Sequence, residues 1–148
     1  MTDHNMYSEI ILMHNRSGHN RHALSGETHA ERGHNPSCGD DLTLHLRVVD
    51  GIIESASYTG SGCALSQASI SIMIDLITGM DLDSAKNMAN DFFDMARGET
   101  ISPEAEEALQ DAMAFQNIAK MPARTKCGTL GWHCLTASIA ETTADDVN

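Results

Sequence analysis

Three cysteines and one aspartate, far apart along the chain, most constrain what this sequence can fold into. Cys38 and Asp40 stand just before an alternating strand pattern, Cys63 follows a glycine before a helical pattern, and Cys127 precedes the last helical pattern. Three thiolates and one carboxylate are the donors that fill a tetrahedral zinc site. The same thiols also suit an iron–sulfur cluster or the passing of sulfur between partners. We therefore predict that the fold brings these four residues together at one end of a sheet.

The expected positions of the thiols support a reactive site. Cys63 and Cys127 are each predicted at the N-terminus of a helix, where partial positive charge and free N–H groups favour the thiolate form. Cys134 lies two helical turns after Cys127 and is predicted to be a core residue. Cysteine is also a small buried hydrophobe, and the chain has no Cys-x-x-Cys pair, so the spacing alone leaves core packing open for each thiol.

The rest of the pattern predicts a single α+β domain over residues 1–148. Alternating apolar residues over 41–50, the turn dipeptide Asp50-Gly51 and a second strand over 52–59 predict a hairpin. A short amphipathic helix over 6–14 and a long polar loop over 15–35 precede it, and residues 142–148 are expected to form a frayed tail.

We expect a small antiparallel sheet of two or three strands, about five helices packed on one face, and the metal site at one end. The later helices are expected over 64–78, from Asp81 or Asp83 to 97, over 103–117 and from about 127 to 140.

The net charge limits the classes of partner that this protein is expected to bind. A formal charge of −12 disfavours nucleic acid and acidic membrane surfaces, which attract basic proteins, and would suit a basic protein surface. No apolar run approaches the roughly 20 residues of a membrane span, and the N-terminal residues lack the basic and apolar regions of a signal peptide. We expect a cytoplasmic protein, in which four cysteines indicate metal binding or catalysis rather than disulfides.

The cysteine motifs resemble those of a known family. The blocks Asn35-Pro36-Ser37-Cys38-Gly39-Asp40, Gly60-Ser61-Gly62-Cys63 and Pro122-Ala123-Arg124-Thr125-Lys126-Cys127 are similar, in order, to the three cysteine blocks of the U-type iron–sulfur cluster assembly proteins, which include the NifU N-terminal and IscU-like domains. The segments 7–14 and 82–98 also fit, so the resemblance covers nearly the whole chain.

Two features resemble the SufU branch of that family rather than its scaffold branch. In the scaffold branch a histidine directly precedes the third cysteine and the interval before it is shorter, whereas this chain has Lys126 there and an extra predicted helix over 103–117. The resemblance implies zinc-dependent sulfur transfer. A PLP-dependent, SufS-like cysteine desulfurase would hold sulfur as a persulfide, and this protein would accept it and pass it to a downstream cluster-assembly scaffold.

The resemblance also implies roles for individual residues. Cys38, Asp40, Cys63 and Cys127 would bind Zn²⁺, Cys38 would accept the sulfur, and Arg124 would lie beside the site, balancing its charge or meeting the partner. One alternative is a non-enzymatic scaffold that assembles a transient [2Fe–2S] cluster, or binds iron, on the same cysteines. Another is a zinc-stabilised interaction domain without sulfur chemistry. Whether the protein counts as an enzyme, a sulfurtransferase acting with a desulfurase, stays open.

Two further groups of residues carry expectations. The loop histidines are predicted to be solvated, although His34 stands near enough to Cys38 in the sequence to offer an alternative ligand. Gly128 and Gly131 stand where the family tends to have small residues such as alanine, and each is expected to weaken the last helix by roughly 0.5–1 kcal/mol. The loop histidines are His19, His22, His29 and His34.

Overall fold

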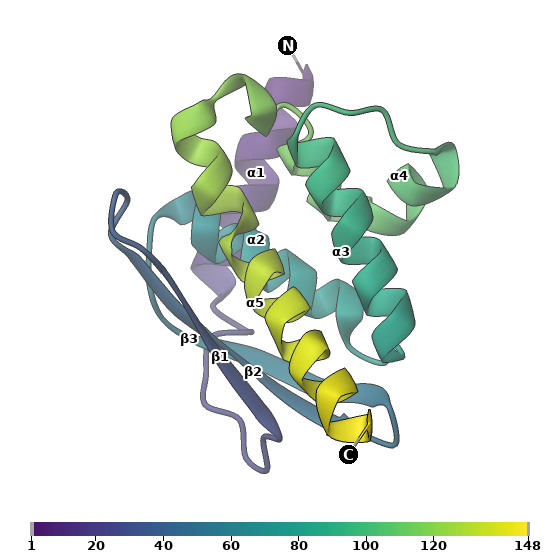
Figure 1. Ribbon diagram of the computed structural model, residues 1–148. Helices are drawn as coiled ribbons and strands as arrows, with labels where there is room; N and C mark the ends of the chain where they lie inside the picture. Colours follow the sequence, from purple (N-terminus) through teal and green to yellow (C-terminus); the bar gives the residue numbers. More distant parts are fainter. Residues whose placement is uncertain (1, 148) are drawn as a thin grey trace.

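Helices cover one face of a three-stranded antiparallel sheet in the computed structural model, which describes the backbone over residues 2–147 and the side chains over 9–142 (Figure 1). The sheet has the order β1-β2-β3, so β2 is central. This arrangement confirms the predicted α+β class and the sheet with helices on one face. The elements, in chain order, are α1 (Thr2–Ser17), β1 (His29–Asn35), β2 (Asp40–Val49), β3 (Ile52–Ser61), α2 (Ala64–Ile77), α3 (Leu82–Ala96), α4 (Pro103–Leu109), the 3₁₀ helices η1 (Gln110–Phe115) and η2 (Ile118–Lys120), and α5 (Pro122–Val147).

The β2–β3 hairpin forms as its sequence pattern predicts. Leu42, Leu44 and Leu46 are fully buried on one face of β2, and the residues between them are half-buried on the other. Asp50 and Gly51 both have positive φ, 53° and 77°, as a tight two-residue hairpin turn requires. The alternation therefore sets which face of the sheet meets the helices.

Strand β1 was not predicted, because it lies in the segment expected to be a loop. Its sequence, His-Ala-Glu-Arg-Gly-His-Asn, has no apolar alternation. The strand is held instead by its backbone pairing with β2 and by α5, which packs on it. A Cβ on Gly33 would lie 2.7 Å from Cys134 Sγ, so only glycine allows this close approach. A strand stabilised by partners distant in sequence carries little local signal.

The middle helices agree with the predicted boundaries and caps. Asp81 caps α3 by accepting a hydrogen bond from the Ser84 N–H, and Ser102 caps α4 in the same way. The segment expected as one helix over 103–117 is divided, because α4 ends at Leu109 and Gln110 adopts a positive φ of 45° before η1. One face of α3 is buried in the core, and its buried residues include Ala85, Met88, Phe92, Met95 and Ala96.

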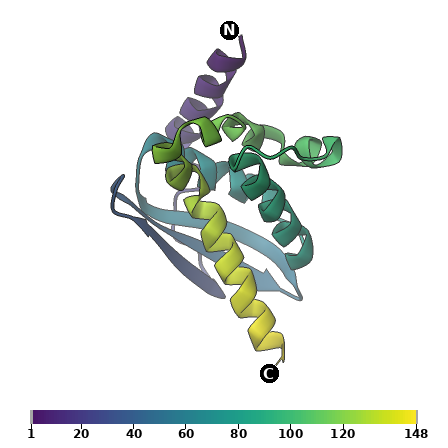
Figure 2. The ribbon, with the colours of Figure 1, turned by 45° about the horizontal axis from the view of Figure 1, so that its top comes forward.

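Helix α5 crosses the sheet and organises the core (Figure 2). It begins at Pro122 rather than near Cys127, since proline is favoured in the first helical turn, and continues to Val147. Its Trp132 ring stacks on Phe92 with 4.2 Å between ring centroids. The side chains of residues 1–8 and 143–148 lie outside the described residues, and although the backbone is helical to Val147, fraying of the tail stays a prediction. Within residues 2–147, none of the helices combines the length and apolarity that crossing a membrane requires.

Candidate metal centre

The turn between β1 and β2 places two of the predicted ligands. Asn35 and Asp40 are paired across the hairpin, and the turn between them is closed by a hydrogen bond from the Cys38 N–H to the Asn35 carbonyl, 3.2 Å. Gly39, with a φ of 72°, supplies the left-handed residue that completes the turn. Cys38 is therefore half-exposed at the end of the sheet, while the Asp40 side chain points inward and is fully buried.

The Asp40 carboxylate is fixed on one side and free on the other. Its Oδ1 accepts hydrogen bonds from the Cys63 N–H, 2.8 Å, and from the Ser66 hydroxyl, 3.0 Å. A Cβ on Gly62 would lie 2.7 Å from the same oxygen, so a glycine is needed there. Asp40 Oδ2 is buried and has no hydrogen-bond partner within the described part of the chain. A buried carboxylate oxygen without a donor is expensive unless something binds it.

Cys127 reaches this site from α5. Its sulfur lies 2.8 Å from that of Cys38 and 4.0 Å from the Asn35 side-chain nitrogen, and its side chain is fully buried. Because α5 begins at Pro122, the prediction that Cys127 lies at a helix N-terminus is wrong. Burial raises the pKa of its thiol, and the Cys38 and Cys63 thiols and the Asp40 carboxylate raise it further. In the metal-free protein Cys127 is therefore a thiol rather than the expected thiolate.

Cys63 completes the group at its edge. It is the N-cap residue of α2, as predicted, and is half-buried. Its sulfur lies 3.7 Å from the Ser66 hydroxyl, and its thiol interacts with Cys127. One donor atom from each of Cys38, Asp40 and Cys127 lies within 4.8 Å of the other two, and Cys63 borders this trio. The fold thus gathers all four predicted ligands at one end of the sheet.

The structure also places the residues around the cluster. Arg124 is exposed in the first turn of α5, next to Ala123, whose carbonyl oxygen is 3.9 Å from Cys38 Sγ. His34 is exposed on β1 opposite Asp41 and is outside the cluster, which does not support it as a ligand. Ser66 was not predicted as a residue of the site, although its position one helical turn after Cys63 could have indicated that it lies near the cysteine.

The residues present fit a zinc ion. Cys38, Asp40 and Cys127 have donor atoms within 4.8 Å of one another, Cys63 borders them, and the buried Asp40 Oδ2 has no hydrogen-bond partner among the described residues; three thiols and a carboxylate are the donors of a tetrahedral zinc site. The same soft sulfur donors also suit iron–sulfur chemistry, so the donor set limits the ion to a small class without selecting one.

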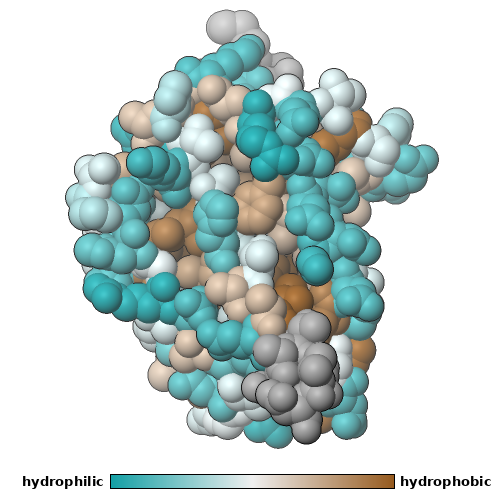
Figure 3. Space-filling model, viewed as in Figure 1, coloured by the Kyte–Doolittle hydropathy of each residue, from teal (hydrophilic) through white to brown (hydrophobic). Residues whose placement is uncertain are grey.

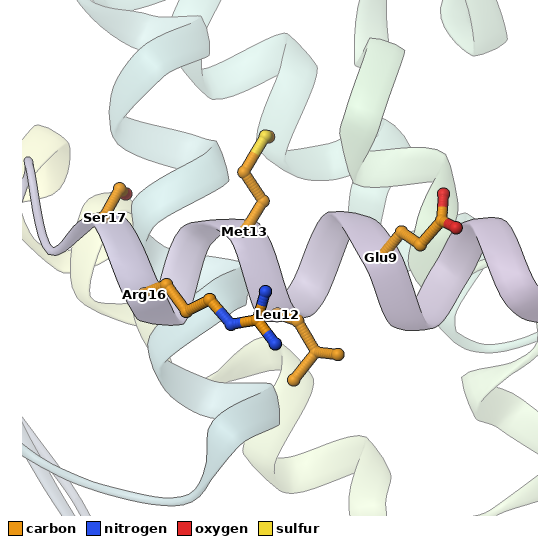
Figure 4. Close-up of a pocket in the computed structure, with 5 residues that line it drawn as sticks. All are labelled: Glu9, Leu12, Met13, Arg16 and Ser17. Carbon is orange, nitrogen blue, oxygen red and sulfur yellow. The ribbon is translucent and has the colours of Figure 1, made fainter.

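The face that Figure 3 shows is mostly hydrophilic, with smaller apolar areas. A shallow hollow on α1 is lined in part by apolar side chains, since Leu12 and Met13 are 46% and 55% exposed there beside Glu9, Arg16 and Ser17 (Figure 4). It contains no thiol and no histidine, and it has no part in the metal centre.

Comparison with known proteins gives a consistent result. Residues 6–145 match the family described as the NifU-like N terminal domain. The chain is 37% identical over 134 residues to the "Iron-sulfur cluster assembly scaffold protein IscU" of Thermotoga maritima, covering 90% of this chain and 92% of that one. It is 34% identical over 136 residues to the "Zinc-dependent sulfurtransferase SufU" of Bacillus subtilis, covering 92% and 90%. A crystal structure titled as a putative scaffold for the SUF system, from Fervidobacterium islandicum, superposes with a TM-score of 0.84 at 30% identity, covering 92% and 98%.

Proposed function

Because the chain belongs to the family of NifU-like N-terminal domains, we propose that it is a zinc-dependent sulfur transfer protein of iron–sulfur cluster assembly. It accepts persulfide sulfur from a PLP-dependent, SufS-like cysteine desulfurase and passes it to a downstream assembly scaffold. The observation that carries this proposal is the half-exposed Cys38 thiol standing beside a buried Cys127–Asp40 pair, in a protein whose similar relatives include one named as a zinc-dependent sulfurtransferase.

Each residue of the cluster has a distinct part in this proposal. Cys38, Asp40, Cys63 and Cys127 hold the zinc ion, and zinc, which has no redox chemistry, would keep the thiolates reduced. Cys127 and Asp40 are fully buried and serve as ligands only. Cys38 lies on an exposed turn with the access that a partner thiol needs, which makes it the acceptor.

The transfer itself is a thiol–persulfide exchange. The Cys38 thiolate attacks the terminal sulfur of the desulfurase persulfide, a new sulfur–sulfur bond forms on Cys38, and the old one breaks to release the desulfurase thiolate. No net oxidation occurs, because one persulfide is consumed and one is formed. Arg124, exposed beside the turn, supplies positive charge where two anionic sulfur groups meet.

Two features of this chain support the sulfur transfer branch over the scaffold branch. Lys126, an exposed residue of α5, occupies the place directly before Cys127. The segment from α4 to η2 inserts additional helical turns between α3 and α5 along the chain. The acidic surface, with a formal charge of −12, would suit a basic docking face on the desulfurase.

The test is anaerobic purification followed by metal analysis and a desulfurase assay with and without this protein. We expect one zinc per chain, faster alanine release, and a mass gain of one sulfur on the peptide that contains Cys38. Cys38→Ala should retain much of the zinc and accept no sulfur, while Ser37→Ala, in the same exposed turn, should behave as wild type. Persulfide uptake by Cys38→Ala would show that Cys38 is not the acceptor.

The second candidate is a scaffold that assembles a [2Fe–2S] cluster on the same cysteines. It is supported by the identity to the Thermotoga maritima protein named as a scaffold and by the affinity of thiolates for both kinds of centre. Bound iron and sulfide in the purified protein, with no effect on desulfurase turnover, would favour this function over sulfur transfer.

A further inference from the structure

A second group of metal-binding side chains lies away from the cysteines. His14 comes from α1, His19 from the following loop and Asp75 from the last turn of α2, and one donor atom from each lies within 4.8 Å of the other two. Asp75 is twelve residues beyond Cys63 along α2, which places it roughly 18 Å from the cysteine end at 1.5 Å per residue. The cluster is therefore separate from the metal centre described above.

The His14 ring is held in place by a hydrogen bond from one of its two nitrogens. Its side chain is buried, and its Nδ1 lies 2.8 Å from the Ser71 hydroxyl. The Asn20 amide donates to the same hydroxyl, 3.1 Å, and to the Ser71 carbonyl, 2.9 Å, which fixes the serine. Nε2 of His14 carries no hydrogen bond in the part of the chain that the structure describes, so its lone pair is free when Nδ1 holds the proton.

The His19 ring is also held by a hydrogen bond at its Nδ1. Its Nδ1 lies 2.7 Å from the Ser17 hydroxyl, and its Nε2 is 3.1 Å and 3.2 Å from the two carboxylate oxygens of Asp75. Asn20 also donates to Asp75 Oδ1, 3.0 Å, and so orients the carboxylate. Histidines that bind metals characteristically use one nitrogen for a supporting hydrogen bond and the other for the ion. His14 shows that arrangement, whereas the Nε2 of His19 contacts Asp75 and also lies 3.1 Å from the Asn20 amide nitrogen, so an ion bound by His19 replaces those contacts.

A hollow lies next to His14 and Asp75. Its volume is about 140 Å³, and His14, Asp75, Gln110 and Asp111 contribute to its wall. The carboxylates of Asp75 and Asp111 both act electrostatically on the His14 ring, so Asp111 faces it from η1. A hollow of this size accommodates an ion together with water ligands.

We propose that His14, His19 and Asp75, with Asp111 across the hollow, form a second metal site for a divalent first-row transition ion. Two imidazoles and one carboxylate are a donor set that proteins use for Zn²⁺ and Fe²⁺. The bound ion ties α1 and the loop after it to α2 and η1, so it stabilises the N-terminal part of the fold. This site does not depend on sulfur transfer at Cys38.

The test uses the full-length protein already carrying zinc at the cysteine site, titrated with zinc chloride in a calorimeter. We expect a second equivalent to bind, and His19→Ala or Asp75→Asn to weaken that second binding at least tenfold. His22→Ala, in the same loop, and Asp83→Asn, an exposed acid on α3, are the matched controls and should bind the second equivalent as wild type does. Circular dichroism checks that each variant is folded.

Cobalt(II) distinguishes the two sites spectroscopically. In metal-free protein, binding at the cysteines gives sulfur-to-cobalt charge-transfer absorption, whereas binding at His14, His19 and Asp75 adds only weak visible bands. We expect the visible bands to keep growing after the charge-transfer band has saturated, and this later growth to be lost in His19→Ala. Absence of a second equivalent in wild type, or its persistence unchanged in both variants, would overturn the proposal. Neither result bears on sulfur transfer.

Discussion

The sulfur atoms of Cys38 and Cys127 lie 2.8 Å apart, although 89 residues separate them along the chain. One is in the exposed turn between β1 and β2, and the other is on the buried face of α5. The pair therefore joins an accessible thiol to an inaccessible one, and several measurable consequences follow from that asymmetry and from the packing around it.

Oxidation of the metal-free protein is expected to join Cys38 to Cys127. Two thiols held this close form a disulfide when an added oxidant such as diamide takes up two electrons and two protons, whereas zinc-loaded protein should resist, because the ion holds both sulfurs. Peptide mapping without reductant would identify the bond. A disulfide through Cys134, or equal oxidation of the zinc-loaded form, would contradict this prediction.

Asp40→Asn is expected to weaken zinc binding at least tenfold and to leave the metal-free fold as stable as wild type or more so. The amide keeps an acceptor for the Cys63 N–H and the Ser66 hydroxyl but removes the charged ligand. Asp40→Ala leaves the Cys63 N–H without its acceptor, although the Ser66 hydroxyl can still donate to the Cys63 carbonyl, 3.0 Å away, and it should also lower the free energy of unfolding by about 1–3 kcal/mol. Chelator competition and urea unfolding measure the two effects. Equal zinc affinity in wild type and Asp40→Asn would show that Asp40 is not a ligand.

Arg124→Ala is expected to slow sulfur acceptance without changing zinc content. The side chain is exposed, so its loss should leave packing intact, while a positive charge is removed from the residue next to Ala123, whose carbonyl oxygen lies 3.9 Å from Cys38 Sγ. Single-turnover transfer from a persulfide-loaded desulfurase measures the rate. Arg124→Lys should recover part of it, and Arg97→Ala, an exposed arginine at the end of α3, is a control that should not change it.

Gly131→Ala is expected to destabilise the protein, although alanine is the better helix former. A Cβ at residue 131 would lie 2.8 Å from Ile70 Cβ and 3.2 Å from Ile70 Cα, atoms that cannot move without shifting α2. The overpacking costs about 1–3 kcal/mol, more than the gain of about 1 kcal/mol in helix propensity. At Gly128 the nearest atom is the end of the Ile118 side chain, which can rotate, so Gly128→Ala should cost less. Urea unfolding compares the two variants, and a larger loss at residue 128 would contradict this packing argument.

Cys134 is expected to resist alkylation in the native protein. Burial, together with the nearby Glu31 carboxylate, raises the pKa of its thiol to about 11. At pH 8 the group is therefore almost entirely protonated, and the thiolate fraction grows only as the pH approaches 11. Iodoacetamide followed by mass mapping should modify Cys134 only after denaturation. Rapid native modification would mean that the interface between α5 and β1 opens readily.

The sequence predicted the elements whose signals are local. The alternation in β2 and the Asp50-Gly51 turn each depend on residues within a few positions of one another and are confirmed, and of the two predicted starts of α3, Asp81 and Asp83, the structure has Asp81 as the cap. The cysteines and Asp40 were recognised from their motifs and are found together. The two glycines of α5, expected to weaken that helix, are instead where it packs closely on Ile70 and Ile118.

The sequence by itself determined which side chains are available for chemistry and where most regular elements begin and end, because those depend on residue type and short-range spacing. Only the tertiary structure decided which of them meet. It made β1 a strand through pairing with β2, buried Cys127 on the inner face of α5, and brought the exposed loop residue His19 against Asp75. These outcomes depend on contacts between residues tens of positions apart. Such contacts produce no regular spacing of residue types in the sequence, so the sequence pattern does not predict them.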